Sequence, residues 1–392
     1  MRLAERIQGI GTETSFEAAA RARALEATGR DVIHLEIGEP DFDTPANIRH
    51  AAARALEAGF THYGPATGLP ALREAIAADA TRRKGFDVSP DRVIVTPGAK
   101  PIMFYALLAL AGPGDEVIYP DPGFPIYESM TRFVGATPVP IVLREENGFR
   151  LDTDELRRLV SPRTRLVIFN SPQNPTGSVL TKADIEAIAA IAVERDLTVL
   201  ADEIYGRILY DGTHHSVAAL PGLPERTIVL DGFSKTYAMT GWRLGYAIVP
   251  ESLVLPFSRL IINSVSCTSS YSQMAAVEAL TGPQDSVDAM VREFRVRRDL
   301  IVEGLNAIDG IRCLEPDGAF YVFPNVAGTG MDGERFADRM LYDGGVSVLA
   351  GTAFGSSGLN HVRISYANSQ EKIRDALRRI EGVVAGVAAG AA

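Results

Sequence analysis

The stretch TKADIEAIAAIAVERDLTVLAD, residues 181–202, contains a helical pattern followed directly by a strand pattern. Thr181 with Asp184 three residues later is typical of a helix start. The residues that mark one helical face are Ile185, Ile188, Ala189 and Ala192. The run at 197–201 is apolar without alternation, which is typical of a strand covered on both faces. A helix that leads directly into such a strand indicates an α/β fold.

Six other apolar, β-branched runs have the same character. Together the seven runs are residues 92–96, 116–119, 137–142, 165–169, 197–201, 227–230 and 245–249. Most are separated by segments of helical periodicity. This alternation over roughly residues 50–280 predicts a doubly wound α/β domain around a mostly parallel, seven-stranded sheet.

The C-terminal part has a different pattern. A long, charged amphipathic helix is predicted over residues 287–307 and a second helix over 371–384, with short strands at 319–323 and 361–366 between them. We expect a smaller α+β domain that also includes the N-terminal segment. The predicted limits are 1–45 for an N-terminal lid segment, 46–280 for the large domain and 281–392 for the small C-terminal domain.

The composition narrows the class of protein. The chain has 392 residues, and 39 basic against 49 acidic residues give a net charge of −10. This charge argues against nucleic acid or an anionic membrane as the main partner. Its two cysteines give no disulfide framework, and its longest uncharged apolar run, residues 101–111, is shorter than the roughly 18 residues of a membrane span. With no apolar signal core at the start, we expect a cytoplasmic protein.

Ligands of open α/β sheets bind beyond the carboxyl ends of the strands, so the residues after each apolar run are informative. The first run is followed by a turn that contains Gly98, Ala99 and Lys100 and then by a helical pattern. Such a turn presents free backbone N–H groups to an anion, although the same sequence also suits a purely structural turn. These three residues are candidates for binding a phosphate.

The next strand ends also carry polar residues. Residues 170–177, NSPQNPTG, form a proline-rich loop that can aim the amide of Asn174. Asp202 follows a buried strand, where a carboxylate either has a partner or caps a helix, and Tyr205 comes three residues later.

A lysine and an arginine follow the strand at 227–230. A lone lysine is usually a surface residue, but Lys235 at the end of a buried strand would lose its proton easily and could form a Schiff base. Arg243, eight residues later, is suited to bind a phosphate through two parallel hydrogen bonds from its guanidinium group.

Together these residues match what pyridoxal phosphate requires. Lys235 would form the Schiff base, and Asp202 would keep the pyridine nitrogen protonated so that the ring acts as an electron sink. Asn174 and Tyr205 can hydrogen-bond the ring hydroxyl oxygen, while the glycine turn and Arg243 hold the phosphate.

The motifs at 174–177 (NPTG), 202–205 (DEIY) and 234–245 (SK, then GWRLG) resemble those of fold-type-I pyridoxal-phosphate enzymes. More narrowly, they resemble class I aminotransferases of the bacterial aspartate aminotransferase branch. The similarity runs from Gly38 to the motif that begins at Arg363. It implies ping-pong transamination between an L-amino acid and a 2-oxo acid, with Lys235 as Schiff-base lysine and proton shuttle.

The resemblance implies further roles. Phe124 would stack on the cofactor ring, and Tyr63 would reach the phosphate of the neighbouring subunit, which implies a homodimer with active sites at the interface. Arg363 would grip the substrate α-carboxylate, Gly38 would offer a backbone N–H to the same group, and Asn174 would also contact the substrate. One departure is Gly232, where relatives often carry a phosphate-binding serine; Ser234 is the candidate replacement.

The substrate side chain is predicted from three residues. A lysine at the position of Lys100 helps to hold a distal carboxylate in the resembling branch, although it could instead only cap the turn. In the expected lid segment, Glu13 would repel a dicarboxylate if it faced the pocket, and Phe16 would favour an apolar or aromatic side chain. We expect aspartate or glutamate first, and a neutral or aromatic amino acid next.

Other functions stay open at this point. The same scaffold could catalyse β-elimination or α-decarboxylation, although a tight grip of Arg363 on the carboxylate disfavours decarboxylation. A non-catalytic ligand-sensing domain of a transcription regulator would carry a DNA-binding extension, which the negatively charged chain does not suggest.

Three other patterns are set aside. The G-x-G-x-x-G match at 328–333 lacks the strand–helix context of a dinucleotide site. His214 and His215 lack further metal-ligand spacing, so we expect no metal. The basic run at 295–298 (RVRR) is expected to be a solvated helix face or an interface contact.

Overall fold

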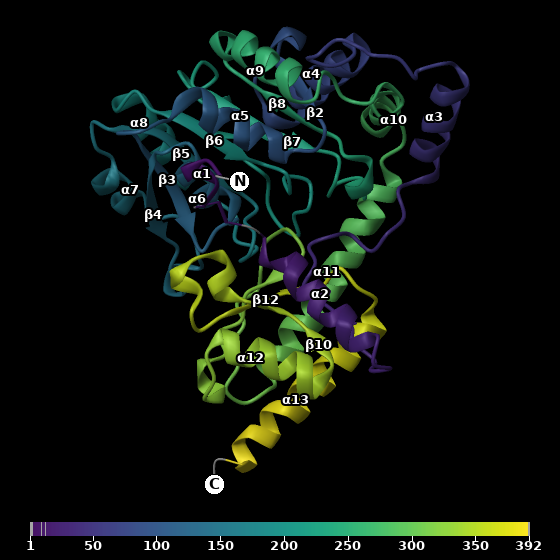
Figure 1. Cartoon of the computed structure of the whole chain (residues 1–392), viewed down its shortest axis with the longest axis vertical. Coiled ribbons are helices and arrows are strands. Elements are labelled where there is room, and N and C mark those ends of the chain that lie inside the picture. Colours follow the sequence, from purple (N-terminus) through teal and green to yellow (C-terminus); the bar gives the residue numbers. More distant parts are fainter. Residues whose placement is uncertain (1–2, 9, 12, 391–392) are drawn as a thin grey trace.

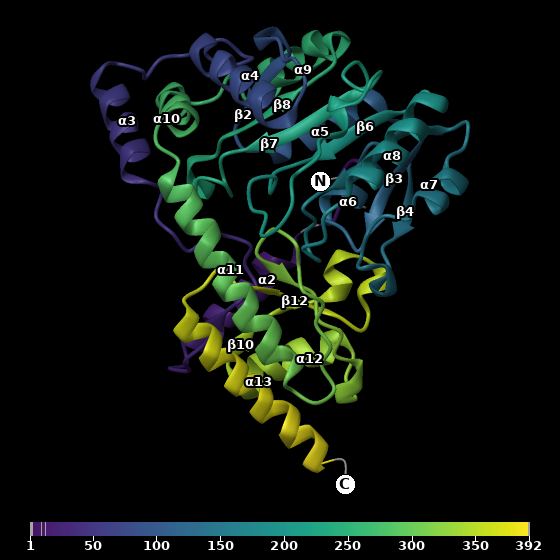
Figure 2. The same ribbon diagram turned by 180° about the vertical axis from the view of Figure 1, so that it is seen from behind.

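The computed structural model describes residues 3–8, 10–11 and 13–390. Figure 1 shows a larger upper part built around one sheet and a smaller lower part that ends in helix α13 (Gln370–Gly390). The long helix α11 (Asp285–Asn306) runs from the upper part into the lower one and packs beside α13, as Figure 2 shows from behind.

The large sheet has seven strands in the order β2-β8-β7-β6-β5-β3-β4. Strand β8 runs antiparallel to both of its neighbours, and the remaining pairings are parallel. The strands are β2 (Val93–Thr96), β3 (Glu116–Asp121), β4 (Thr137–Val142), β5 (Thr164–Asn170), β6 (Thr198–Asp202), β7 (Thr227–Gly232) and β8 (Gly245–Ile248). The predicted seven-stranded, mostly parallel sheet is confirmed.

Helices cover both faces of this sheet. In β6, Leu200 packs in the core cluster that includes residues of α5 and α9, whereas Val199 and Ala201 pack in the cluster that includes α7 and α8. Strands β2 and β8 pack against α3, α4 and α10. These helices are α3 (Ala46–Glu57), α4 (Pro70–Lys84), α5 (Lys100–Leu110), α6 (Ile126–Phe133), α7 (Thr153–Leu159), α8 (Lys182–Glu194), α9 (Glu251–Ser264) and α10 (Ser270–Thr281). The domain is doubly wound, as predicted.

The edge strand β4 differs from the expectation that every strand is covered on both faces. Of its six residues only Ile141 is buried. Pro138 and Pro140 lie in this strand, and proline is tolerated at a sheet edge because it lacks the N–H that an inner strand must donate. The apolar composition of this run therefore does not imply that the strand is buried on both faces.

Helix α8 begins as the sequence predicts. The Thr181 hydroxyl accepts a hydrogen bond from the Asp184 amide at 3.2 Å, and the Asp184 carboxylate accepts one from the Thr181 amide at 2.9 Å. This reciprocal pair is a capping box, and it fixes where the helix starts.

The smaller part contains two short sheets. Strands β9 (Tyr321–Val322), β12 (Val362–Ser365) and β11 (Leu349–Ala350) form an antiparallel sheet, and β1 (Ile33–His34) pairs in parallel with β10 (Val346–Ser347). The N-terminal segment therefore packs with the C-terminal part, together with α2 (Thr14–Glu26) and α12 (Gly333–Arg339). The domain limits at residues 45 and 280 stay a prediction.

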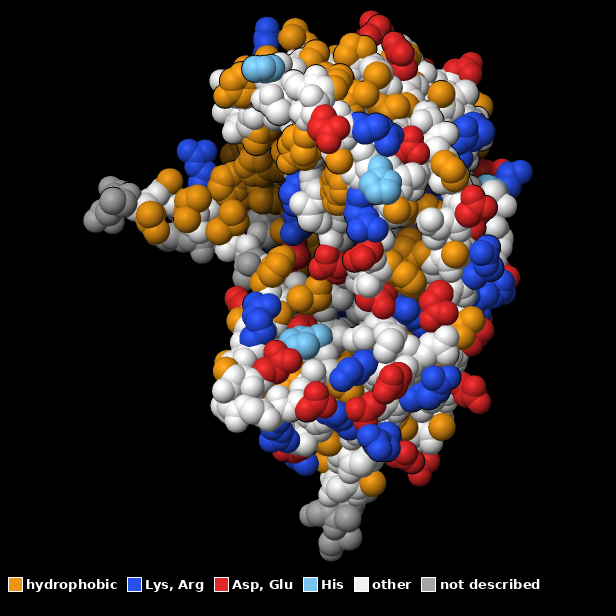
Figure 3. Space-filling view, turned by 90° about the vertical axis from the view of Figure 1, so that its right-hand side faces the viewer, with side chains coloured by type: hydrophobic (Ala, Val, Ile, Leu, Met, Phe, Trp, Pro, Cys, Tyr) orange, Lys and Arg blue, Asp and Glu red, His pale blue; other side chains and the backbone are white. Residues whose placement is uncertain are grey.

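The first helix, α1 (Glu5–Gln8), belongs to a stretch that extends away from the body of the molecule in Figure 3. Leu3 and Ile7 in this stretch are exposed. Among the described residues, no helix is long and apolar enough to cross a membrane.

The basic run on α11 was expected to be a solvated helix face or an interface contact, and the first alternative is wrong for two of its three arginines. Arg297 and Arg298 are buried, and only Arg295 is largely exposed. Arg297 pairs with Asp41 at 2.6 Å and lies over the ring of Phe42, 4.8 Å from its centroid. Ion pairs and aromatic faces compensate the desolvation of these guanidinium groups.

We expect Thr181→Ala to lower the free energy of unfolding by about 1 kcal/mol, because it removes the hydroxyl that caps α8. Chemical denaturation followed by circular dichroism measures this loss. Lys182→Ala, at the next and exposed position, is the control and should change stability by less than about 0.5 kcal/mol. Equal losses in both variants would contradict the capping argument.

Candidate active site

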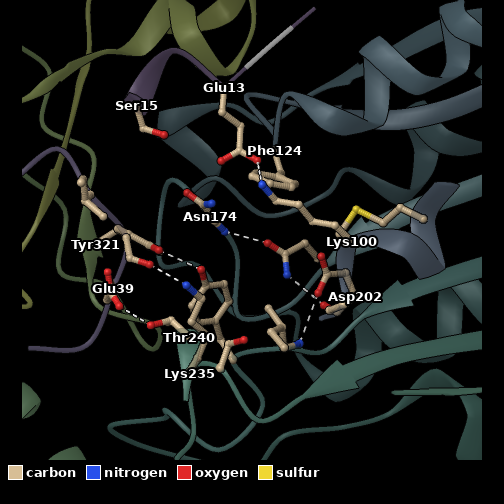
Figure 4. Close-up of a pocket in the computed structure, with 18 of the residues that line it drawn as sticks. Glu13, Ser15, Glu39, Lys100, Phe124, Asn174, Asp202, Lys235, Thr240 and Tyr321 are labelled. Atoms are coloured by element: carbon tan, nitrogen blue, oxygen red, sulfur yellow. Dashed lines mark hydrogen bonds and ion pairs between the residues drawn. The ribbon is translucent and has the colours of Figure 1, made fainter. Parts of the chain in front are cut away.

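A cavity of about 520 Å³ lies where the carboxyl ends of β5, β6 and β7 face the smaller part (Figure 4). It combines residues from the strand ends, the start of α5, the N-terminal segment and the smaller part. The predicted residues that line it are Phe16, Gly38, Ala99, Lys100, Phe124, Asn174, Asp202, Tyr205, Ser234, Lys235, Arg243 and Arg363. The sheet therefore brings together most of the residues that the sequence singled out.

Asp202 ends β6 and is buried. The Tyr127 hydroxyl donates a 2.6 Å hydrogen bond to one carboxylate oxygen, and the Ile204 amide donates a 3.2 Å bond to the other. Burial raises the pKa of Asp202 to about 6, although both hydrogen bonds act in the opposite direction. A buried acid of this kind is stabilised in its charged form by a cation, such as a protonated ring nitrogen.

A second group of buried charges lies next to Asp202. The Lys84 ammonium, at the end of α4, donates hydrogen bonds to Glu203 at 2.6 Å and to Asp231 at 2.8 Å. Burial alone would raise the pKa of Asp231, but the charges of Lys84 and Arg83, together with hydrogen bonds from Lys84 and the Gly232 amide, outweigh burial and lower the pKa. Lys84 therefore bridges the carboxylates of two adjacent strand ends.

Lys235 follows the end of β7. Its ammonium donates a 2.5 Å hydrogen bond to the backbone oxygen of Gly38 in the N-terminal segment. Burial lowers the pKa of Lys235 to about 8, while the carboxylate of Glu39 acts in the opposite direction. A substantial fraction of this amine is therefore neutral near pH 7.5, as a nucleophile or general base requires.

The turn before α5 packs closely against β8 and Arg243. Gly98 has φ +88°, and a Cβ placed there would lie 2.2 Å from an Arg243 guanidinium nitrogen. A Cβ on Gly245 would lie 2.6 Å from the Ala99 amide nitrogen. Backbone N–H groups at a helix start and a guanidinium therefore converge, which is the arrangement that binds a phosphate.

Arg363 of β12 is buried between the rings of Tyr321 and Phe354, 4.7 and 4.9 Å from their centroids. Its terminal nitrogens donate to the Asn174 side-chain oxygen at 3.2 Å and to the backbone oxygen of Glu36. Among the described residues its Nε has no hydrogen-bond partner. A buried guanidinium with unused donor capacity is suited to bind a carboxylate.

Tyr205 and Gly38 lie close to the same arginine. The Tyr205 and Tyr321 hydroxyls are 2.8 Å apart. A Cβ on Gly38 would lie 2.1 Å from the Tyr321 hydroxyl oxygen, so only glycine fits at this position without displacing the tyrosine.

Lys100 and Glu13 form an ion pair inside the cavity. The Lys100 ammonium also lies over the rings of Phe124 and Phe16, 5.7 and 5.8 Å from their centroids. Phe16 is 61% exposed, so this end of the cavity reaches the surface.

Tyr63 and Gly98 are the predicted site residues outside the cavity lining, and Gly232, where the sequence departs from the resembling enzymes, also lies outside it. Tyr63 is 90% exposed and does not line the cavity of its own chain. Gly232 packs against β8, where a Cβ would lie 3.1 Å from the Gly245 Cα, so a serine there would be crowded. Gly98 directly precedes Ala99, which does line the cavity, and Ser234 lines the cavity as well.

Several site residues were missed from the sequence. Tyr127, Tyr321 and Glu39 come from a helix, from the smaller part and from the N-terminal segment rather than from the strand ends that were searched. Asn170, in the same loop as Asn174, is a further one: its side chain donates to the Asp202 backbone oxygen at 2.9 Å and accepts from the Asn174 backbone amide at 2.8 Å. Its position at the end of β5 was the available signal.

These residues fit pyridoxal phosphate. The buried acid of Asp202 is suited to pair with the ring nitrogen of that cofactor. The Lys235 amine, which loses its proton easily, is suited to react with the aldehyde. Gly98 and Arg243 form a cradle for the phosphate.

Comparison with known proteins agrees with this geometry. The family model described as aminotransferase class I and II matches residues 30–380. The chain is 42% identical to an aspartate aminotransferase of Pyrococcus horikoshii, over 98% of this chain and 97% of that protein. It is 40% identical to aromatic-amino-acid aminotransferase 2 of Thermococcus litoralis, over 98% of both chains. The solved structure of Thermus thermophilus aspartate aminotransferase with maleate superposes with a TM-score of 0.94 at 40% identity, covering 98% of this chain and 100% of that one.

We expect the Lys235 amine of the cofactor-free protein to react with pyridoxal phosphate at a rate that rises with pH and has its midpoint near 8, because the neutral fraction rises as the pH passes the lowered pKa. Stopped-flow absorbance over pH 6–10 measures the rate. Glu39→Gln removes a charge that raises this pKa and should move the midpoint to lower pH. A midpoint near the ordinary lysine value of 10.5 would contradict the argument.

Proposed function

The chain belongs to the class I and II aminotransferases and is a pyridoxal-phosphate-dependent transaminase, and we propose that aspartate and glutamate are its favoured amino donors. In the proposed ping-pong reaction, the 2-oxo acid formed from the first substrate leaves before a second 2-oxo acid binds. The observation that supports the proposed reaction is that Lys235, Asp202 and Arg363 line one cavity, so that a base, an acid for the ring nitrogen and a carboxylate ligand meet in one site.

The proposed base is Lys235. When bound, the cofactor supplies an electron sink that stabilises negative charge on the substrate Cα. Asp202, held by the Tyr127 hydroxyl, would keep the ring nitrogen protonated. The Lys235 amine, neutral at lower pH than an ordinary lysine, would take the proton from the substrate Cα. Tyr205 and Asn174 would bind the ring hydroxyl oxygen.

Arg363 is the proposed ligand of the substrate α-carboxylate. The Glu36 carbonyl, the Asn174 amide and two aromatic rings fix its guanidinium before substrate arrives. A fixed fork loses little conformational freedom on binding, which supports a two-bond contact with a carboxylate. Gly38 would supply a backbone N–H to the same group, as proposed for the resembling enzymes.

The proposed preference for acidic substrates rests on Lys100. It is a cation in the cavity lining that the phosphate cradle and the α-carboxylate site do not require. Relatives named aspartate aminotransferase and one solved structure with the dicarboxylate maleate support this preference. A neutral or aromatic donor is the alternative, supported by Phe16 in the lining and by the relative named aromatic-amino-acid aminotransferase 2.

We further propose a homodimer in the cytoplasm. The 90% exposed Tyr63 is free to contact another subunit, where it would reach the phosphate as the resemblance implies. The projecting stretch around α1, with Leu3 and Ile7 exposed, is an apolar surface that a second copy would cover (Figure 3). Two free cysteines are consistent with a reducing compartment.

Transamination predicts one equivalent of 2-oxo acid per active site when the holoenzyme meets an amino acid without an acceptor, and no more until an acceptor is added. We expect this single turnover to be fastest with aspartate or glutamate in a panel of amino acids. Lys235→Ala should lose the visible absorbance of the bound cofactor and nearly all turnover. Sustained release of pyruvate or CO₂ from the amino acid alone would indicate a lyase or decarboxylase instead.

Replacing Arg363 by alanine should raise the KM for amino acids by about 10- to 100-fold, because a charge-assisted two-bond contact is lost. Retention of the cofactor should not change, since the guanidinium is assigned to the substrate and not to the phosphate. Steady-state kinetics and the absorbance of the purified protein measure both quantities. Arg374→Ala, exposed on α13, is the matched control and should leave KM unchanged. Loss of the cofactor in Arg363→Ala would contradict the assignment.

A further inference from the structure

Glu13 and Lys100 meet in the cavity from different parts of the chain. Glu13 precedes α2 in the N-terminal segment, and Lys100 is the first residue of α5, beside the phosphate cradle (Figure 4). The Glu13 side chain is 14% exposed and the Lys100 side chain 45% exposed. Among the described residues, Glu13 is the one carboxylate within ion-pair distance of Lys100. The chain therefore already places a carboxylate on the cation assigned to an acidic substrate.

Two aromatic rings also flank Lys100. Its ammonium lies over the rings of Phe16 and Phe124, and these two rings also line the cavity. An uncharged substrate side chain can pack against such rings while the Glu13–Lys100 pair stays intact. A neutral or aromatic amino acid thus requires no break in an ion pair.

An acidic substrate faces a different situation. Its α-carboxylate is assigned to Arg363, so its second carboxylate has Lys100 as partner. With Glu13 in place, two carboxylates would share one ammonium, and like charges at such short range repel. The Glu13 side chain must then turn away from Lys100 and lose its ion pair.

We propose that Glu13 is a specificity-determining residue that competes with the distal carboxylate of an acidic substrate for Lys100. By this competition it weakens dicarboxylate binding more than monocarboxylate binding, for which its charge acts only at longer range on Arg363, so that one cavity accepts both substrate classes. This inference rests on the proposed function, because it assumes that the distal side chain points to Lys100.

The test compares two unreactive inhibitors on the holoenzyme, maleate with two carboxylates and 3-phenylpropionate with one. Their Kd values are measured from the change in cofactor absorbance. In Glu13→Gln we expect maleate to bind about three- to tenfold more tightly, because its competitor is gone. The Kd of 3-phenylpropionate should stay within about twofold of the wild-type value.

Two further variants make the test specific. Glu17→Gln removes one negative charge from an exposed position on the same helix, outside the cavity lining, and should change neither Kd. In the Lys100→Met background, Glu13→Gln should no longer tighten maleate binding, because the contested cation is absent. Equal maleate binding by wild type and Glu13→Gln, or equal tightening of both inhibitors, would refute the role of Glu13.

These outcomes are separable from those of the proposed function. Failure of the wild-type enzyme to turn over aspartate and glutamate refutes the substrate preference. If the enzyme turns over aspartate but Glu13→Gln does not change the Kd of maleate, the substrate preference is supported and only the competition is refuted.

Discussion

The site depends on one constraint: Asp202, Lys235 and Arg363 are buried in the same cavity, and none of them has an ion-pair partner among the residues that the structure describes. Burial raises the pKa of Asp202 and lowers those of Lys235 and Arg363, so each group is less stable in its charged form than it would be in water. Ligands that bring a cationic ring nitrogen, an aldehyde and a carboxylate relieve these costs. Hydrogen bonds hold the three groups in place before these ligands bind. Tyr127 donates to Asp202, Lys235 donates to the Gly38 carbonyl, and Arg363 donates to the Asn174 side-chain oxygen.

The sheet topology explains how these groups meet. Parallel strands β5, β6 and β7 end at the same edge, so Asn170, Asp202 and the residues after β7 are neighbours although they are far apart in sequence. The antiparallel strand β8 then begins at this edge, which places Arg243 and Gly245 against the turn before α5. The smaller part adds Arg363 from outside the sheet.

The sequence alone was sufficient to find a site residue where that residue directly follows a recognisable buried strand. Buried strands read as apolar runs, and the polar residue after each run is conspicuous, so Asp202 and Lys235 could be found without coordinates. It was insufficient where the partner is distant along the chain. The ion pairs of the buried Arg297 with Asp41 and of the buried Lys84 with Glu203 link positions more than a hundred residues apart, and nothing local distinguishes such cations from solvated ones. Tyr127 and Tyr321 were missed for the same reason. The two prolines of β4 indicate an edge strand, although this run, like the other six, was expected to be covered on both faces.

The attachment of the N-terminal segment to the smaller part has an evolutionary consequence. Strand β1 joins that part through its pairing with β10, and the residues around it supply Glu13, Phe16 and Gly38 to the cavity. The groups assigned to the reaction itself, Asp202 and Lys235, come from the large sheet. Of the residues assigned to the substrate side chain, Glu13 and Phe16 thus lie in the N-terminal segment, whereas Lys100 lies at the start of α5. Mutations in the first forty or so codons can therefore change the range of substrates that such an enzyme accepts, while Asp202 and Lys235 stay unchanged.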